Sequence, residues 1–151
     1  NIELIKVKKL FKKICIASDH AGYLMKERIK DYLINKSISV IDLGPFSEDS
    51  VDYPDYAKKI AKRLILLKSD AGILVCGSGT GMAITANKFK GIRAAQCYNK
   101  TSTILSRQHN NCNIICLGSR MLKNNEAIKY VKYFLNTKFE GGRHQKRINK
   151  I

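Results

Sequence analysis

No hydrophobic run in this sequence is long enough to cross a lipid bilayer. The longest apolar runs, such as Ile14–Ala17 and Ile114–Leu117, are far shorter than the roughly 20 residues that a membrane helix needs. The N-terminus lacks a stretch that resembles the hydrophobic segment of a signal peptide, so we expect no secretory leader. A chain of 151 residues with 44% hydrophobic and 26% charged residues is typical of a single soluble globular domain.

Cysteine patterns typical of disulfide-bonded or zinc-binding proteins are also missing. The five cysteines are odd in number, no C-x-x-C occurs, and Cys112 and Cys116 are four residues apart. We therefore expect neither a disulfide framework nor a zinc site, and we predict no metal. Cys15, Cys97 and Cys116 lie in apolar runs, where a thiol usually packs as a small hydrophobic group. These thiols indicate a reducing compartment, and we predict a cytoplasmic protein.

Acidic residues are scarce. The sequence has 12 Asp and Glu against 28 Lys and Arg, a formal net charge of +16. Such an excess raises nucleic-acid binding as an alternative function. The lysines are nevertheless scattered over predicted helices, without interleaved aromatic residues, at Lys26, Lys30, Lys58, Lys62 and Lys129. A codon bias towards Lys, Asn and Ile explains the charge equally well, so nucleic acid stays a remote alternative.

Residues 1–11 differ in composition from the rest of the chain. They are rich in lysine, and we interpret them as a basic N-terminal extension. The remnant of a targeting peptide is the alternative, although Arg and Ser, which transit peptides favour, are absent there. No linker, repeat or low-complexity segment interrupts residues 12–151, which we expect to form one domain.

Short apolar runs alternate with longer amphipathic stretches along this domain. The runs that we predict as strands are Ile14–Ser18, Ser39–Leu43, Ala71–Cys76, Ile92–Cys97 and Asn113–Leu117. The stretches that we predict as helices are 22–36, 53–68, 79–89, 101–110 and 125–136. The alternation predicts an α/β fold with a five-stranded parallel sheet, helices on both faces and the flavodoxin-like strand order 2-1-3-4-5.

Polar or reactive residues follow the first and third predicted strands. In a doubly wound sheet, ligands bind beyond the carboxyl ends of the strands, where the strand order reverses. With the predicted order this point lies between Ser18-Asp19-His20 and Cys76-Gly77-Ser78. An adjacent Asp and His at a strand end is less often structural than a single His. The two groups together predict a ligand site at this edge.

The segment Cys76–Gly81 joins a predicted strand to a predicted helix. Its glycines let the backbone bend tightly and approach a ligand. It is not a dinucleotide fingerprint, because Met82 replaces the last glycine, and no Gly-Lys-Ser/Thr of a P-loop follows. A thiol near a helix N-terminus is a plausible base or nucleophile, which is the function we consider for Cys76. A buried cysteine at a strand end remains the alternative.

Further candidates lie in the C-terminal half. His109-Asn110 ends a predicted helix, where these residue types are also common as a cap, so both interpretations stay open. Arg143 and Arg147 are four residues apart and would share one face of a helix. Paired guanidinium groups suit a phosphate dianion, with Arg120 as a further contact. A solvated basic terminus is the alternative.

The sequence resembles the type B ribose-5-phosphate isomerases and their relatives that act on galactose and allose 6-phosphates. The matching segments occur in order over about residues 12–148: Ser18-Asp19-His20-Ala21-Gly22, Asp52-Tyr53-Pro54, Cys76-Gly77-Ser78-Gly79-Thr80-Gly81, Ala86-Asn87-Lys88, Gly91-Ile92-Arg93-Ala94, Ser106-Arg107-Gln108-His109-Asn110, Leu117-Gly118-Ser119-Arg120 and Glu140-Gly141-Gly142-Arg143-His144. One branch of the family uses a Glu shortly after the glycine loop as base. This sequence has Met82 there, so it resembles the cysteine branch.

The resemblance implies a Rossmann-like three-layer α/β/α sandwich that works as a homodimer, paired into tetramers in some members, without a cofactor. It implies that Cys76 moves a proton between C2 and C1 through a cis-enediolate, that His109 assists ring opening, and that Ser78 belongs to the catalytic group. The residues that it implies for substrate binding are Asp19, His20, Tyr53, Gly77, Gly79, Gly81 and Asn110. Those that it implies for phosphate binding are His20, Arg120, Arg143 and Arg147, with some contacts across the dimer interface.

We therefore predict interconversion of D-ribose 5-phosphate and D-ribulose 5-phosphate in the non-oxidative pentose phosphate pathway. The nearest alternative is a galactose or allose 6-phosphate isomerase of the same family. A non-catalytic nucleotide-binding domain is disfavoured by the missing dinucleotide fingerprint and P-loop.

Overall fold

The computed structural model describes residues 9–151, so most of the predicted extension over residues 1–11 lies outside the described residues. The strands are β1 (Ile14–Ser18), β2 (Val40–Asp42), β3 (Ala71–Cys76), β4 (Ala94–Gln96) and β5 (Ile114–Gly118). The helices are α1 (Tyr23–Asn35), α2 (Tyr53–Ile65), α3 (Thr80–Ala86), α4 (Lys100–Gln108), α5 (Asn124–Asn136) and α6 (Arg143–Ile148). All five strands pair in parallel, as predicted.

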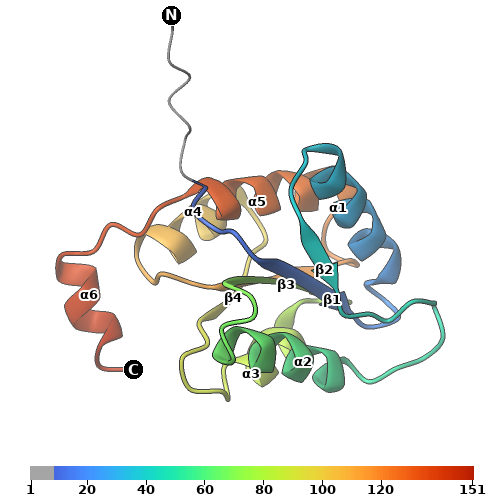
Figure 1. Ribbon diagram of the computed structural model, residues 1–151, viewed down its shortest axis with the longest axis horizontal. Coiled ribbons are helices and arrows are strands. Elements are labelled where there is room, and N and C mark those ends of the chain that lie inside the picture. Colours follow the sequence, from blue (N-terminus) through green and yellow to red (C-terminus); the bar gives the residue numbers. More distant parts are fainter. Residues whose placement is uncertain (1–8) are drawn as a thin grey trace, which may run out of the picture.

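The sheet lies between two layers of helices, with α1, α4 and α5 on one face and α2 and α3 on the other (Figure 1). Successive side chains of a strand point to opposite faces, so each buried strand supplies both hydrophobic cores. In β1, for example, Ile16 packs with the α1 and α5 residues, whereas Cys15 packs with the α2 and α3 residues. The predicted three-layer α/β/α sandwich is thereby confirmed.

The order of the last two strands differs from the predicted flavodoxin-like order. The sheet runs β2-β1-β3-β5-β4, so β5 lies beside β3 and β4 forms an edge. All residues of β5 are buried, whereas those of β4 are half-buried or exposed. An entirely apolar strand suits a central place, while a short strand that ends in Gln96 tolerates the edge. The predicted switch point is unaffected, because β2, β1 and β3 keep their order.

A buried ion pair connects α1 to the end of β2. The side chain of Lys26 is fully buried, and its Nζ donates to both carboxylate oxygens of Asp42 at 2.9 and 2.8 Å. Asp42 also accepts from the backbone N–H of Gly44, whose carbonyl accepts from Ser18 N–H at 3.0 Å. Burial alone would raise the pKa of Asp42, but the hydrogen bonds from Lys26 and Lys30 lower it below its ordinary value. The pair thus supports the chain just before Asp19.

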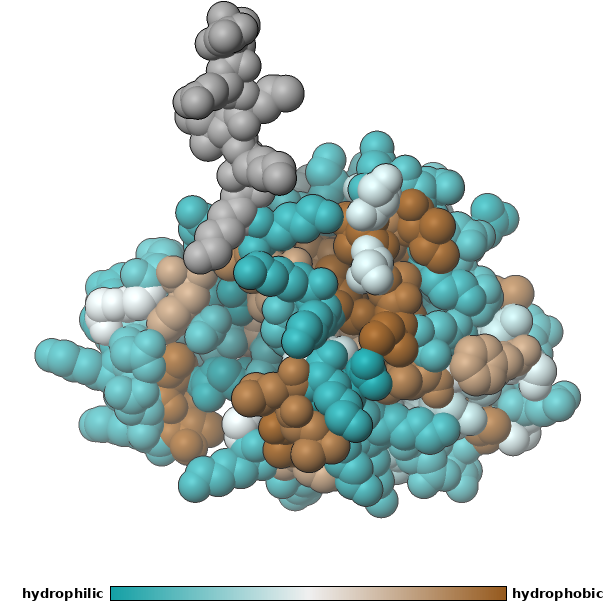
Figure 2. Space-filling view, viewed as in Figure 1, coloured by the Kyte–Doolittle hydropathy of each residue, from teal (hydrophilic) through white to brown (hydrophobic). Residues whose placement is uncertain are grey.

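The first described residues already belong to the packed structure. Phe11, which the sequence assigns to the extension, stacks on Phe134 of α5 with ring centroids 6.0 Å apart, and the guanidinium of Arg107 lies over its ring. None of the helices over residues 9–151 is long and apolar enough to span a membrane. The face in Figure 2 is mostly hydrophilic, with separate hydrophobic patches.

Candidate active site

Two neighbouring strands bring Asp19 and Cys76 to one edge of the sheet. β1 pairs with β3, and the backbone N–H of Asp19 donates to the carbonyl of Val75 at 3.1 Å. A pocket of about 360 Å³ opens here. Its lining residues are Asp19, Tyr53, Cys76, Gly77, Ser78, Gly81, Arg120 and Met121. Seven of these eight were predicted from the sequence, and only Met121 was missed.

The thiol of Cys76 lies at the end of β3 with 4% of the residue exposed. Its Sγ accepts a hydrogen bond from the backbone N–H of Gly79 at 3.1 Å. A backbone N–H directed at sulfur stabilises a thiolate, because charged acceptors form the stronger hydrogen bonds. Cys76 thus packs in the core beside α2 and α3, and its sulfur also lines the pocket and has a backbone donor that a base or nucleophile could use.

The other four cysteines belong to the two hydrophobic cores, and burial affects their thiols. Burial raises the pKa of Cys15 to about 11 and that of Cys112 to about 12. Burial also raises the pKa of Cys97, and it raises that of Cys116 well above its ordinary value. These four thiols stay protonated at neutral pH. This agrees with the small hydrophobic groups predicted for Cys15, Cys97 and Cys116, whereas Cys112 was not part of that prediction.

The glycine loop after β3 is fixed by the segment that follows β5. The N–H of Ser119 donates to the carbonyl of Cys76 at 2.8 Å, and the N–H of Arg120 donates to the carbonyl of Gly77 at 2.9 Å. In a planar trans peptide the N–H points opposite to the carbonyl. The N–H groups of Gly77 and Ser78 are therefore directed away from the segment after β5, and both residues line the pocket.

Two glycines of this loop are required by its geometry. Gly79 has φ of +82°, in the left-handed region that favours glycine. A Cβ on Gly81 would lie 2.5 Å from the ring of Tyr53, so the ring is packed directly on the backbone. Tyr53 begins α2, where Pro54 suits the first turn. The helix after the loop, α3, is shorter than predicted, with seven residues.

Arg120 and His20 differ in their relation to the pocket. A Cβ on Gly77 would lie 3.0 Å from Nη1 of Arg120, which places this guanidinium beside the loop. His20 is exposed and is absent from the pocket lining; its Nδ1 lies 3.1 Å from the carbonyl oxygen and 3.2 Å from the backbone nitrogen of Val51. The Asp19 carboxylate accepts from the N–H of Gly22 at 3.0 Å, which fixes the start of α1.

The remaining predicted residues lie elsewhere. His109 and Asn110 connect α4 to β5, and a connection that leads into a strand of this parallel sheet lies at its amino edge. Arg93, just before β4, donates through Nε to the carbonyl of Asn110 at 2.7 Å, which confirms this location. In one chain, His109 and Cys76 are therefore at opposite edges.

Helix α6 joins this second group through a pair of histidines. The ring of His144 stacks on that of His109 with centroids 4.2 Å apart, and Glu140 Oε1 lies 3.7 Å from His109 Nε2. Arg143 and Arg147 are on α6 and exposed, so the basic terminus is a helix rather than irregular. The pKa of His144 is lowered by burial and then by nearby His109 and Arg143.

Within residues 9–151, His109, Glu140 and His144 form a cluster that could hold a metal ion, because their ligand atoms all lie within 4.8 Å of one another. The rings are close to parallel, with an interplanar angle of 14°. Ring-nitrogen lone pairs lie in the ring plane, so parallel rings direct them side by side rather than to one point. The arginines of α6 add positive charge. The geometry favours a positioned histidine over a metal ligand set.

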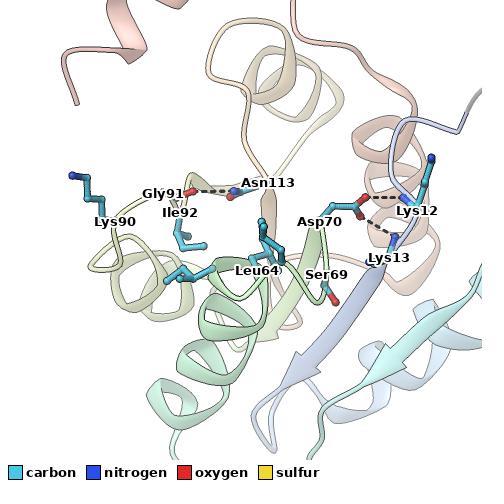
Figure 3. Close-up of a pocket in the computed structure, with 11 residues that line it drawn as sticks. Lys12, Lys13, Leu64, Ser69, Asp70, Lys90, Gly91, Ile92 and Asn113 are labelled. Atoms are coloured by element: carbon cyan, nitrogen blue, oxygen red, sulfur yellow. Dashed lines mark hydrogen bonds between the residues drawn. The ribbon is translucent and has the colours of Figure 1, made fainter.

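A larger hollow of about 620 Å³ lies at the amino edge, away from Cys76 (Figure 3). Leu64 and Ile92 contribute apolar surface there, and it contains none of the predicted site residues. Its carboxylate, Asp70, already accepts from the backbone N–H groups of Lys12 and Lys13, both at 2.9 Å. The smaller pocket beside Cys76 is the one whose lining includes a thiol, a carboxylate and a guanidinium.

Comparison with known proteins shows the family to which this fold belongs. The model of the Ribose/Galactose Isomerase family matches residues 14–151. Ribose-5-phosphate isomerase B of Escherichia coli K12 is 43% identical over 140 residues, covering 93% of this chain and 94% of the relative. The structure of a ribose 5-phosphate isomerase from Thermotoga maritima is 51% identical with a TM-score of 0.90, covering 91% of this chain and 95% of that one.

A further structure, ribose-5-phosphate isomerase B from Mycoplasma genitalium with bound ribulose-5-phosphate, is 45% identical with a TM-score of 0.86. It covers 91% of this chain and 92% of that one. The sequence match, the shared fold and the near-complete coverage agree with one another. This chain therefore belongs to the ribose/galactose isomerase family.

Proposed function

We propose that this protein is an isomerase that interconverts D-ribose 5-phosphate and D-ribulose 5-phosphate, a step of the non-oxidative pentose phosphate pathway. The observation that carries the proposal is the Cys76 thiol in a pocket that also contains the Asp19 carboxylate and the Arg120 guanidinium. A carboxylate can accept from sugar hydroxyls, and a guanidinium suits a phosphate dianion. Relatives that bear the name of this enzyme support the choice of substrate.

In this mechanism Cys76 transfers one proton. Its thiolate removes the proton from C2 of the open-chain aldose, and the electrons of the C2–H bond form the C1–C2 double bond of a cis-enediolate. The former carbonyl electron pair becomes negative charge on the C1 oxygen. The C1 oxyanion takes up the hydroxyl proton of the C2–OH group. Return of the proton from sulfur to C1, with formation of the C2 carbonyl, then gives the ketose and regenerates the thiolate. One base on one face of the enediolate is sufficient.

The glycine loop would stabilise the charge that develops on oxygen. The N–H groups of Gly77, Ser78 and Gly81, with the amide of Asn110, are the donors we assign to this task. Hydrogen bonds to the Cys76 and Gly77 carbonyls fix the first two peptides before substrate arrives. Preorganised donors of this kind need no reorganisation during the reaction. Gly79 N–H is already used by the sulfur of Cys76.

The residues of the second group would act on the ring and on the phosphate, and His20 and Arg120 from the carboxyl edge would also contact the phosphate. We assign ring opening to His109, which Glu140 and His144 surround. The residues that we assign to phosphate binding are His20, Arg120, Arg143 and Arg147. Binding energy from a phosphate remote from C1 and C2 holds the sugar in a reactive position.

A second copy of the chain is needed to bring these groups together. Cys76 lies at the carboxyl edge of the sheet and His109 at the amino edge, so one chain alone does not assemble the set. A homodimer in which each His109 group faces the partner's Cys76 pocket would complete two equivalent sites, as two-fold symmetry allows. Pairing of such dimers into tetramers is compatible with this arrangement.

The proposed reaction requires no external electron carrier. Isomerisation reduces C1 and oxidises C2 within one molecule, so we propose no organic cofactor. Proton transfer is assigned to side chains, and we propose that no metal takes part. A cytoplasmic location fits the pathway and the protonated core cysteines.

The test is conversion of ribose 5-phosphate to ribulose 5-phosphate with EDTA present. We expect activity in the wild type, and a loss of about a hundredfold or more in Cys76→Ala, the range for a missing acid–base group. Cys97→Ala, which removes a thiol from the core, is the matched control and should stay active. Equal activity of folded Cys76→Ala and wild type would exclude the thiol as base.

A substrate panel decides between the alternatives. Faster turnover of galactose or allose 6-phosphate than of ribose 5-phosphate would replace the proposed substrate while keeping the family. Absence of turnover on all three, with tight nucleic-acid binding that weakens steeply with salt, would favour the nucleic-acid alternative raised by the charge of +16.

A further inference from the structure

We propose that Gln96 is a positioning residue for Cys76, which it supports through the Ser78–Gly79 peptide. The proposal extends the function proposed above, because it concerns the same thiol. Gln96 is the last residue of β4, the edge strand, and it is exposed in the single chain. It does not line the pocket and is not expected to touch the substrate.

Gln96 makes two hydrogen bonds to the glycine loop. Its Nε2 donates to the carbonyl of Ser78 at 2.8 Å and to Oγ1 of Thr80 at 2.9 Å. One side-chain amide thus connects the edge strand to both sides of Gly79, the residue with φ of +82°. The side chain holds the middle of the loop, whereas the bonds from Ser119 and Arg120 hold its beginning.

The same peptide group links Gln96 to the thiol. The carbonyl of Ser78 and the N–H of Gly79 belong to one planar unit and point in opposite directions. The carbonyl accepts from Gln96, and the N–H donates to Cys76 Sγ at 3.1 Å. The three groups form a continuous chain from Nε2–H through the peptide to sulfur. Hydrogen bonds in such a chain polarise one another, so the first strengthens the last.

Loss of the Gln96 amide should weaken the last bond of this chain. The Ser78–Gly79 peptide would be less polarised and freer to turn, and its N–H would stabilise negative sulfur less well. One neutral hydrogen bond changes an equilibrium by about threefold to tenfold. We therefore expect the fraction of Cys76 present as thiolate at neutral pH to fall about threefold to tenfold when the amide is removed. The value of kcat should fall by a similar factor, and KM should change little.

The experiment compares wild type, Gln96→Leu and Gln96→Glu by alkylation of Cys76 with iodoacetamide, measured by mass spectrometry of its peptide across pH. The Leu side chain has no donor, and the Glu side chain keeps the shape but presents oxygen to the Ser78 carbonyl. At neutral pH both variants should react about threefold to tenfold more slowly than wild type. The difference should vanish at alkaline pH, where hydroxide ionises the thiol without help.

The matched control is Asn136→Leu, which removes another exposed side-chain amide that donates to a backbone carbonyl, that of Lys132 at 2.7 Å. It should alkylate like wild type. Wild-type rates in both Gln96 variants would overturn the proposal. A wild-type rate in Gln96→Glu with a slow Gln96→Leu would overturn it too, since shape alone would then suffice.

Alkylation needs no substrate, so this test is independent of the proposed function. Slower alkylation in a protein without isomerase activity would support the role of Gln96 and reject the function. Unchanged alkylation of the Gln96 variants in an active isomerase would support the function and reject the role of Gln96. A raised KM with unchanged kcat would place Gln96 in substrate binding and would contradict a positioning role.

Discussion

The imidazole rings of His109 and His144 stack with their centroids 4.2 Å apart and an angle of 14° between the ring planes. His109 ends α4 and His144 belongs to α6, so the stack joins two helices that are far apart in the sequence. Two neighbouring imidazolium ions would repel each other, and Arg143 adds a further positive charge. Protonation of His144 in this stack is therefore disfavoured.

The pH dependence of stability should reflect this contact. Burial, His109 and Arg143 lower the pKa of His144, so the unfolded chain binds a proton more readily than the folded one. The stabilisation is present above the ordinary histidine pKa of about 6.5 and is lost as pH falls through the lower folded pKa. We expect the melting temperature to fall between about pH 7 and pH 5, and to fall less in His144→Gln.

Gln145→Ala, a change at the adjacent position of α6, is the control for that measurement. It should leave the slope of melting temperature against pH as in wild type. If His144→Gln and wild type show the same slope, the stack does not carry the acid sensitivity.

The Lys26–Asp42 pair leads to a second prediction. A fully buried charge left without any partner costs about 3–5 kcal/mol, but Lys26 keeps the Glu27 carboxylate at 3.0 Å when Asp42 is changed, so the cost should be at or below the lower end of that range. Asp42→Asn should therefore lower the free energy of unfolding by up to about 3 kcal/mol, measured by urea denaturation. Asp31→Asn, on the same helix as Lys26, is the control and should change it by less than about 0.5 kcal/mol. An equally small effect at Asp42 would mean that Glu27 alone is enough to stabilise the buried Lys26 charge.

The contact of Gly81 with Tyr53 leads to a third prediction. A methyl group on Gly81 would lie 2.5 Å from the Tyr53 ring, so Gly81→Ala must displace the wall of the pocket. We expect a loss of stability of about 1–3 kcal/mol and a clear fall in kcat/KM. The loss of stability should shrink when the same change is made in a Tyr53→Ala background, in a double-mutant cycle. Strict additivity would exclude the ring as the cause.

Complementation tests the shared site. Cys76→Ala and His109→Ala should each be nearly inactive, because each impairs every site of its own dimer. Random reassembly of the two variants makes half of the dimers mixed, and one of their two sites is intact. Activity should therefore return to about a quarter of wild type. A mixture that stays inactive, in a preparation shown to exchange subunits, would contradict a site built from two chains.

Much of the fold follows from local sequence patterns. β1 and β3 occupy the predicted residues, because their buried apolar runs end at polar residues. The positions of β4 and β5 in the sheet do not follow from chain order. Their positions depend on how completely each strand can be buried. The sequence indicates this difference only through the short, less apolar run that ends at Gln96.

The candidate site shows the same division. Asp19 and Cys76 could be predicted at one edge, because that needs only the parallel arrangement of β1 and β3. The contribution of Gln96 could not, because an exposed amide on an edge strand carries no sequence signal until its partners are known. Met121 was missed for a similar reason, since its side chain reaches the pocket from an irregular segment after β5.

The most direct test of Cys76 as a proton-transferring base is isomerisation of ribose 5-phosphate in D₂O, followed by NMR of the ribulose 5-phosphate formed. The thiol exchanges its proton with solvent, so transfer through an enediolate should place deuterium at C1 of the product made by the wild type. Cys76→Ala should form no such product at a comparable rate. Rapid formation of C1-deuterated product by folded Cys76→Ala would contradict the account, because a group other than the thiol would then transfer the proton.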